Sequence, residues 1–126
     1  MSSTQSERPL GERSSAISNL IVGLVSEYTG RGPTKARTYI TDDVITVILQ
    51  DTLTKGERSL VKDGKGDLVL SIRLSFQGAM RTELIDGVEQ IMGRKVRAFM
   101  SANHLEPDIA AETFVLDRLT PQDGLV

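Results

Sequence analysis

The sequence predicts an α+β domain: a four-stranded antiparallel sheet made of two hairpins, with helices packed on it, in the order α-β-β-α-α-β-β. Two stretches, residues 16–29 and 68–92, carry apolar residues at spacings of three and four, which is typical of amphipathic helices. Two other stretches are rich in β-branched and aromatic residues around a short polar segment, as hairpins are. Hairpins separated from helices along the chain favour an antiparallel α+β arrangement.

The first helix is expected over residues 16–29. Ser14 or Ser15 is placed to cap its start, and Gly30 to end it. Its periodic apolar residues are Ile17, Leu20, Ile21, Leu24, Val25 and Tyr28.

The first hairpin is expected over residues 35–50, KARTYITDDVITVILQ, with its turn near Thr41–Asp43. Its second strand, residues 44–49, is apolar at nearly every position, and such strands are covered on both faces. The helices supply one cover. We expect a second subunit to supply the other, and therefore a homodimer with a two-fold interface.

Two further helices should follow. Thr54 and Glu57 have the spacing of a capping box, which predicts a short helix over residues 55–62. Residues 68–92 form the strongest helical pattern in the chain, and Gly93 is placed to end it. Gly87 projects onto the apolar stripe of this helix, so we expect another backbone to approach it closely.

The second hairpin is expected to pair residues 94–101 with 110–116 around the connection ANHLEPDI. The two halves of the chain share one order, which is helix, Gly-Arg, strand, turn, strand and then Leu-Thr. This order suggests a duplicated helix–hairpin unit.

Composition excludes several classes of function. The chain of 126 residues suits one domain, expected over residues 14–119, with mobile polar tails at 1–13 and 120–126. A formal charge of −2 is no footprint for nucleic acid, and no apolar run approaches the roughly 20 residues of a membrane-spanning helix, so no direct membrane insertion is expected. The absence of cysteine excludes thiolate chemistry and disulfides and fits a cytoplasmic location.

Arg73 and Gln77 form the first candidate site. They lie four residues apart inside the apolar stripe of the long helix, so their side chains are neighbours. A guanidinium there must either be paired, with Glu57, Glu83 or an acid of a partner subunit, or bind an anion. The pairing is the structural interpretation, and the anion site is the functional one.

The segment GRGPTKAR supplies a second candidate, an anion site made by Arg31, Lys35 and Arg37. It lacks the spacing of a phosphate-binding P-loop and leads into a strand.

His104, the single histidine, is the third candidate. As a general base it would need an orienting partner and a substrate pocket. The alternative is a residue that shapes a turn or an interface together with Pro107 and Asp108. No metal site, cofactor or catalytic set is expected.

The motifs GRGP, LTKGER.LV and R..FQ..MR.EL...VE...GRKV.AFMS..H..PD.A.E.FVL occur in this order over residues 15–118. In this respect the chain resembles the MpsC family, a bacterial domain named for a sodium-translocating, membrane-potential-generating system and also linked to inorganic-carbon uptake. The resemblance implies a small accessory protein, and it supplies no catalytic residue.

We therefore expect a non-enzymatic cytoplasmic accessory or regulatory protein, a homodimer, whose partner is a membrane system that transports cations or inorganic carbon. The first alternative is a small-molecule or anion sensor that uses Arg73 and Gln77. The second is a hydrolase that uses His104.

Overall fold

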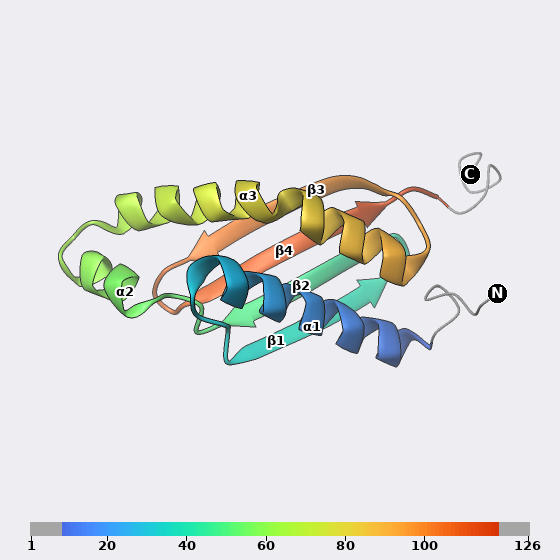
Figure 1. Ribbon diagram of the computed structural model, residues 1–126, viewed down its shortest axis with the longest axis horizontal. Coiled ribbons are helices and arrows are strands. Elements are labelled where there is room, and N and C mark those ends of the chain that lie inside the picture. Colours follow the sequence, from blue (N-terminus) through green and yellow to red (C-terminus); the bar gives the residue numbers. More distant parts are fainter. Residues whose placement is uncertain (1–8, 119–126) are drawn as a thin grey trace.

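A computed structural model describes residues 9–118, in which two long helices lie on one face of a four-stranded antiparallel sheet (Figure 1). The elements are α1 (Leu10–Thr29), β1 (Lys35–Thr41), β2 (Val44–Gln50), α2 (Lys55–Lys62), α3 (Gly66–Met92), β3 (Val96–His104) and β4 (Ile109–Leu116). The predicted fold class and the predicted order of elements are confirmed.

The two hairpins meet in the middle of the sheet. The strand order is β1-β2-β4-β3, so the second strand of each hairpin is central and the first lies at an edge. All three pairings are antiparallel. The Phe99 and Phe114 rings stack on the helix side of the β3–β4 pair, with centroids 4.8 Å apart.

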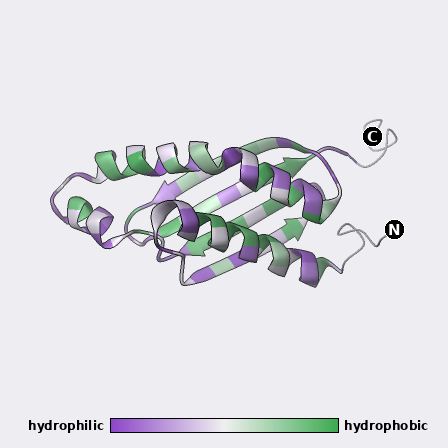
Figure 2. Cartoon of the chain, in the orientation of Figure 1, coloured by the Kyte–Doolittle hydropathy of each residue, from purple (hydrophilic) through white to green (hydrophobic). Residues whose placement is uncertain are grey.

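The core lies between the sheet and the two long helices. Figure 2 shows the predominantly hydrophobic colour of the central strand β2 beneath them. The helices contact each other where Gly87 of α3 faces α1, and a Cβ at Gly87 would lie 2.5 Å from the Leu20 side chain. The expected neighbour was another backbone, and this was wrong, because the close approach is made by a leucine side chain. The fully buried core includes Ile17, Ile21, Ile45, Val47, Leu84, Val88 and Phe114.

Most helix ends lie where the sequence predicted them. The Thr54 capping box is present, and α1 and α3 end at left-handed glycines, Gly30 and Gly93. The start of α1 differs. It begins at Leu10 behind Pro9, whose carbonyl oxygen accepts from the Arg13 amide at 3.0 Å.

The boundaries at the chain ends change accordingly. Residues 10–13, expected in a mobile tail, are the first turn of α1, and Ser14 lies within the helix instead of capping it. The expected domain start at residue 14 therefore lies four residues after the start of α1, where Pro9 occupies the N-cap position without a side-chain hydrogen bond. The rest of the predicted tails, at residues 1–8 and 120–126, lies outside the described residues.

The second hairpin is tighter than expected. Ala102, Asn103 and His104, predicted in the connection, continue β3, and the turn is confined to residues 105–108.

The β2 strand is covered by the described helices on one face only. Ile45, Val47 and Leu49 are buried toward them, while Val44 on the opposite face is 40 % exposed. We call this opposite face of the sheet the bare face. Its residues alternate with the core residues along each strand, in the four cross-strand rows Thr41–Val44–Val115–Ala98, Tyr39–Thr46–Thr113–Met100, Arg37–Ile48–Ala111–Ala102 and Lys35–Gln50–Ile109–His104.

The two halves repeat one local arrangement. After the glycine that ends α1, Arg31 donates through Nε to the carbonyl oxygen of Asp51, 3.3 Å away, just past β2. After the glycine that ends α3, Arg94 donates to the carbonyl oxygen of Asp117, 2.6 Å away, just past β4. The same contact at the same place in each helix–hairpin unit supports the predicted duplication.

Candidate functional site

A buried polar cluster lies where the first half of α3 crosses the sheet. Arg73 and Gln77 project from α3 into the interior and are 5 % and 6 % exposed. Both follow the apolar stripe of the helix, which buries Val69 and Met80 on either side of them. The helix therefore places a cation and an amide where only paired polar groups are stable.

Glu57 of α2 neutralises Arg73. The Arg73 Nη1 atom lies 3.4 Å from Glu57 Oε1 and 3.4 Å from the carbonyl oxygen of Thr52. The capping box fixes this carboxylate, since Oε1 also accepts from the Thr54 amide at 2.8 Å. Glu83, the other partner considered from the sequence, instead accepts from the hydroxyl of Tyr28, and its carboxylate raises the pKa of that hydroxyl.

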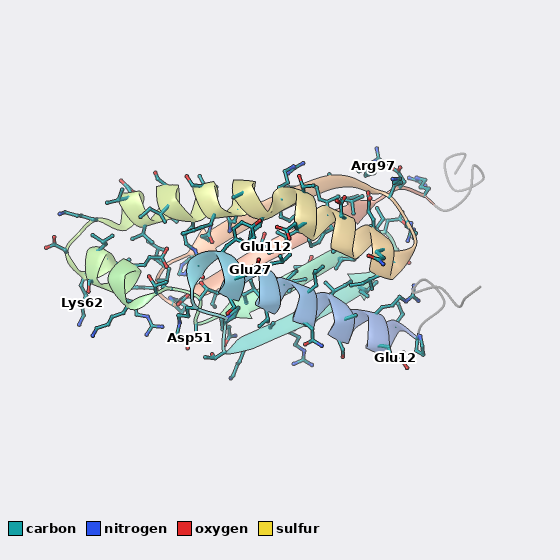
Figure 3. The ribbon with its side chains drawn as sticks, in the orientation of Figure 1. Glu12, Glu27, Asp51, Lys62, Arg97 and Glu112 are labelled. Carbon is teal, nitrogen blue, oxygen red and sulfur yellow. The ribbon has the colours of Figure 1, made fainter. Side chains whose placement is uncertain are left out.

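Gln77 is held by an amide pair and a carboxylate. Its Nε2 donates to Asn103 Oδ1 at 3.0 Å, and its Oε1 accepts from Asn103 Nδ2 at 3.1 Å. The same Nε2 lies 3.4 Å from Glu112 Oε2, and Ser101 donates to Glu112 Oε1. Figure 3 shows Glu112 on β4, in the interior beneath the helices.

Glu112 is the member of this cluster that titrates near neutrality. It is 2 % exposed, and burial raises the pKa of its carboxyl group to about 7. The hydrogen bonds from Ser101 and Gln77 and the charge of Arg73 oppose this rise without cancelling it. A carboxyl group with such a pKa changes charge in response to modest changes of pH.

Sequence reasoning missed Glu112, although a signal was present. Residues 110, 112, 114 and 116 share one face of β4, and three of the four are apolar. An acidic residue at one of these inward-facing positions is expected to be buried. Arg73 and Gln77 on the apolar stripe of α3 indicated polar partners for it on the facing helix.

The predicted anion site does not assemble. Arg31 pairs with Asp51, with Nη2 2.6 Å from Oδ2, and this pairing lowers the pKa of the Asp51 carboxyl group. Lys35 and Arg37 lie instead on the outward-facing positions of β1, where Arg37 sits over the Tyr39 ring at 5.7 Å. Arg31 is therefore engaged by Asp51, whereas Lys35 and Arg37 lie together on the outer side of β1.

His104 and its neighbours shape one end of the sheet. The imidazole Nδ1 of His104 lies 2.7 Å from the carbonyl oxygen of Pro107. The Asp108 carboxylate accepts from Thr52 Oγ1 and from the Leu53 amide, each at 2.9 Å. Asp108 therefore ties the β3–β4 turn to the chain that leaves β2.

The described residues offer no grouping typical of a metal centre. Within residues 9–118, no three His, Asp or Glu side chains are close enough together to hold an ion. The hollow beside α2 is lined by Leu53, Val61 and Leu105 among charged residues, and Arg73 and Gln77 are not part of its lining. Chemically, the cluster can store a proton on Glu112 and join α2, α3 and the sheet.

Comparison with known proteins gives a family and one curated relative. The family model described as "Na+-translocating membrane potential-generating system (MpsC)" matches residues 10–118. The uncharacterized protein YrhF of Bacillus subtilis (strain 168) is 27 % identical over 104 residues, which cover 81 % of this chain and 85 % of that protein. No solved structure matches. Over residues 9–118, no helix has the length and apolar character needed to cross a bilayer.

Proposed function

The chain belongs to the MpsC family, and we propose that it is a non-catalytic accessory or regulatory protein of a sodium-translocating, membrane-potential-generating system, acting on the cytoplasmic side of the membrane. The resemblance noted above extends the same proposal to systems for inorganic-carbon uptake. Translocation itself would belong to another protein, with which this chain associates. The lack of cysteine fits the cytoplasmic placement.

The pairing of Arg73 with Glu57 favours this proposal over the alternative of an anion sensor. An anion sensor needs a cation that is free to receive its ligand, but the buried guanidinium already faces a buried carboxylate. Gln77, the second residue of that alternative, has its amide oxygen and nitrogen engaged by Asn103. The polar cluster is thus better suited to fixing α3 on the sheet than to binding a small molecule.

The surroundings of His104 support a non-catalytic role. Its Nδ1 contacts the carbonyl oxygen of Pro107 within its own turn, and His104 is not part of the lining of the hollow beside α2, where a substrate could be held. The Asp108 carboxylate of the same turn is occupied by Thr52 and Leu53. We therefore assign His104, Pro107 and Asp108 to shaping the turn.

A gene deletion tests the proposal. Cells without this chain should show a smaller sodium-dependent membrane potential, measured with a potentiometric dye, and the wild-type gene should restore it. His104→Ala should restore it equally, because no chemistry passes through the imidazole. An unchanged potential in the deletion strain would overturn the link to the transport system.

Failure of folded His104→Ala protein to restore the potential would instead overturn the non-catalytic role. Circular dichroism of the purified variant would establish that it is folded.

A further inference from the structure

The bare face is large, combines aliphatic residues with threonines along its central strands, and carries no acidic residue. Its exposed large hydrophobic side chains include Tyr39, 51 % exposed, and Met100, 53 % exposed, on opposite edge strands. None of its sixteen residues is aspartate or glutamate, although the chain contains 17 acidic residues. Its cations, Lys35 and Arg37, lie together on the β1 edge.

We propose that a second copy of this chain covers the bare face, sheet against sheet, with the two-fold axis parallel to the strands and above the β2–β4 junction. This names a partner beyond the transport system of the proposed function, and it rests on that function only in placing the dimer in the cytoplasm. Three observations on the face carry it: its area, its pattern of large side chains and its distribution of charge.

The flat area of the face is close to that of a small specific interface. Four strands about 4.8 Å apart and seven residues of about 3.4 Å give a face of about 19 Å by 24 Å, or roughly 450 Å² per copy as a flat sheet. Two copies would bury roughly 900 Å² when the faces are treated as flat, without the additional surface of the side chains. This value approaches the ~1,000 Å² expected of a specific interface. Sheets that stack in this way keep their strands nearly aligned.

The large side chains complement each other under this axis. Rotation about an axis parallel to the strands places β1 of one copy opposite β3 of the other and keeps every cross-strand row at its own level. Tyr39 and Met100 belong to the same row, joined through Thr46 and Thr113. The Tyr39 ring of each copy therefore lies against the Met100 thioether of the other, a favourable sulfur–aromatic contact.

The distribution of charge favours this axis over a two-fold axis that runs across the strands. A two-fold axis across the strands would place β1 over β1 and gather two Lys35 and two Arg37 side chains at one edge. The axis parallel to the strands instead places one Lys35–Arg37 pair at each edge, opposite Ala102 and His104 of β3. Because like charges facing each other oppose association, the parallel axis is favoured.

Light scattering on the purified full chain tests the pairing. The expected mass is twice the 13.8 kDa of one chain. Met100→Lys should raise the dissociation constant of the pair by at least about tenfold, because each copy would place an added cation against Tyr39 and the adjacent Arg37 of the other copy. Leu74→Lys is the matched control, since Leu74 is 61 % exposed on α3, and it should leave the mass unchanged.

Cross-linking tests the axis, using the absence of natural cysteine. Tyr39→Cys and Met100→Cys proteins are prepared separately and treated with a short bismaleimide, alone and as a mixture. Cross-linked dimers should form at least about tenfold faster in the mixture than in either protein alone, because the axis brings residue 39 to residue 100. Fast cross-linking of Tyr39→Cys alone would overturn the axis.

A monomeric mass for the wild-type chain at all concentrations would overturn the pairing itself. Both tests use the isolated protein, so their outcome is independent of the membrane-potential measurement that tests the proposed function.

Discussion

Replacing Glu112 by glutamine should remove much of the pH dependence of folding stability. In the folded chain, burial raises the pKa of Glu112 from 4.5 to about 7. Because the folded state then binds its proton more tightly than the unfolded state, this residue makes the free energy of unfolding fall as pH rises through the interval between the two pKa values.

The magnitude follows from the two pKa values. A shift of this size corresponds to about 3 kcal/mol at pH values above both, and the change between about pH 5 and pH 8 is about 2.5 kcal/mol. Glu112→Gln keeps the shape without the charge. The new amide can face Ser101, whose hydroxyl can accept as well as donate, while its oxygen still accepts from Gln77. The variant should therefore match or exceed the wild type at pH 8.

Urea unfolding at several pH values between about 5 and 8 measures the difference. Glu106→Gln is the matched control, because Glu106 is exposed in the β3–β4 turn, and its pH profile should follow that of the wild type. If Glu112→Gln retains the full slope of the wild type, then Glu112 is already ionised throughout this range, and the description of the cluster as a proton store is wrong.

Three further substitutions test the packing. Arg73→Met should lower the free energy of unfolding by about 3–5 kcal/mol, because it leaves Glu57 buried without its cation; added phosphate or bicarbonate should leave the wild-type Tm unchanged, and a rise would favour an anion site. Thr54→Ala should cost about 1 kcal/mol in denaturant unfolding through loss of the helix cap, and an unchanged midpoint would contradict this. Gly87→Ala should cost up to about 2 kcal/mol, because its methyl group meets the Leu20 side chain while the higher helix propensity of alanine offsets about 1 kcal/mol, and the same change in a Leu20→Ala background should cost measurably less.

Much of the fold could be predicted from the sequence because its signals are local. The Thr54–Glu57 spacing defines a helix start by itself, and Gly30 and Gly93 define helix ends, since each depends on neighbouring residues only. The start of α1 was placed too late because two serines are stronger capping residues than a proline. Which helices cover which face of β2 depends on the whole chain, and so the bare face became visible only in the structure.

The candidate site was harder to predict for the same reason. Helical spacing indicated that Arg73 is buried and put Glu57 among three possible partners, but spacing cannot choose between residues on different elements. Glu112 acquires its raised pKa from burial under α3 together with contacts from β3, and none of these is local to β4. Arg31, Lys35 and Arg37 do not come together, because Arg31 pairs with Asp51 while Lys35 and Arg37 occupy outward-facing positions of strand β1.

In this duplicated architecture, the two halves contact each other in one region of the molecule, and the chain connects them covalently in another. The halves join through the β2–β4 pairing and the packing of α1 on α3, whereas the chain passes between them through α2 and the exposed residues 63–65. A protease that cuts this exposed link should therefore leave a nicked protein whose two fragments stay together. Neither fragment should persist alone, because separation would leave the β2 and β4 edges unpaired and would expose the surfaces of α1 and α3 that pack on each other. The molecule is in this sense a dimer of half-domains on one chain, and fragments made separately should reconstitute the sheet when mixed.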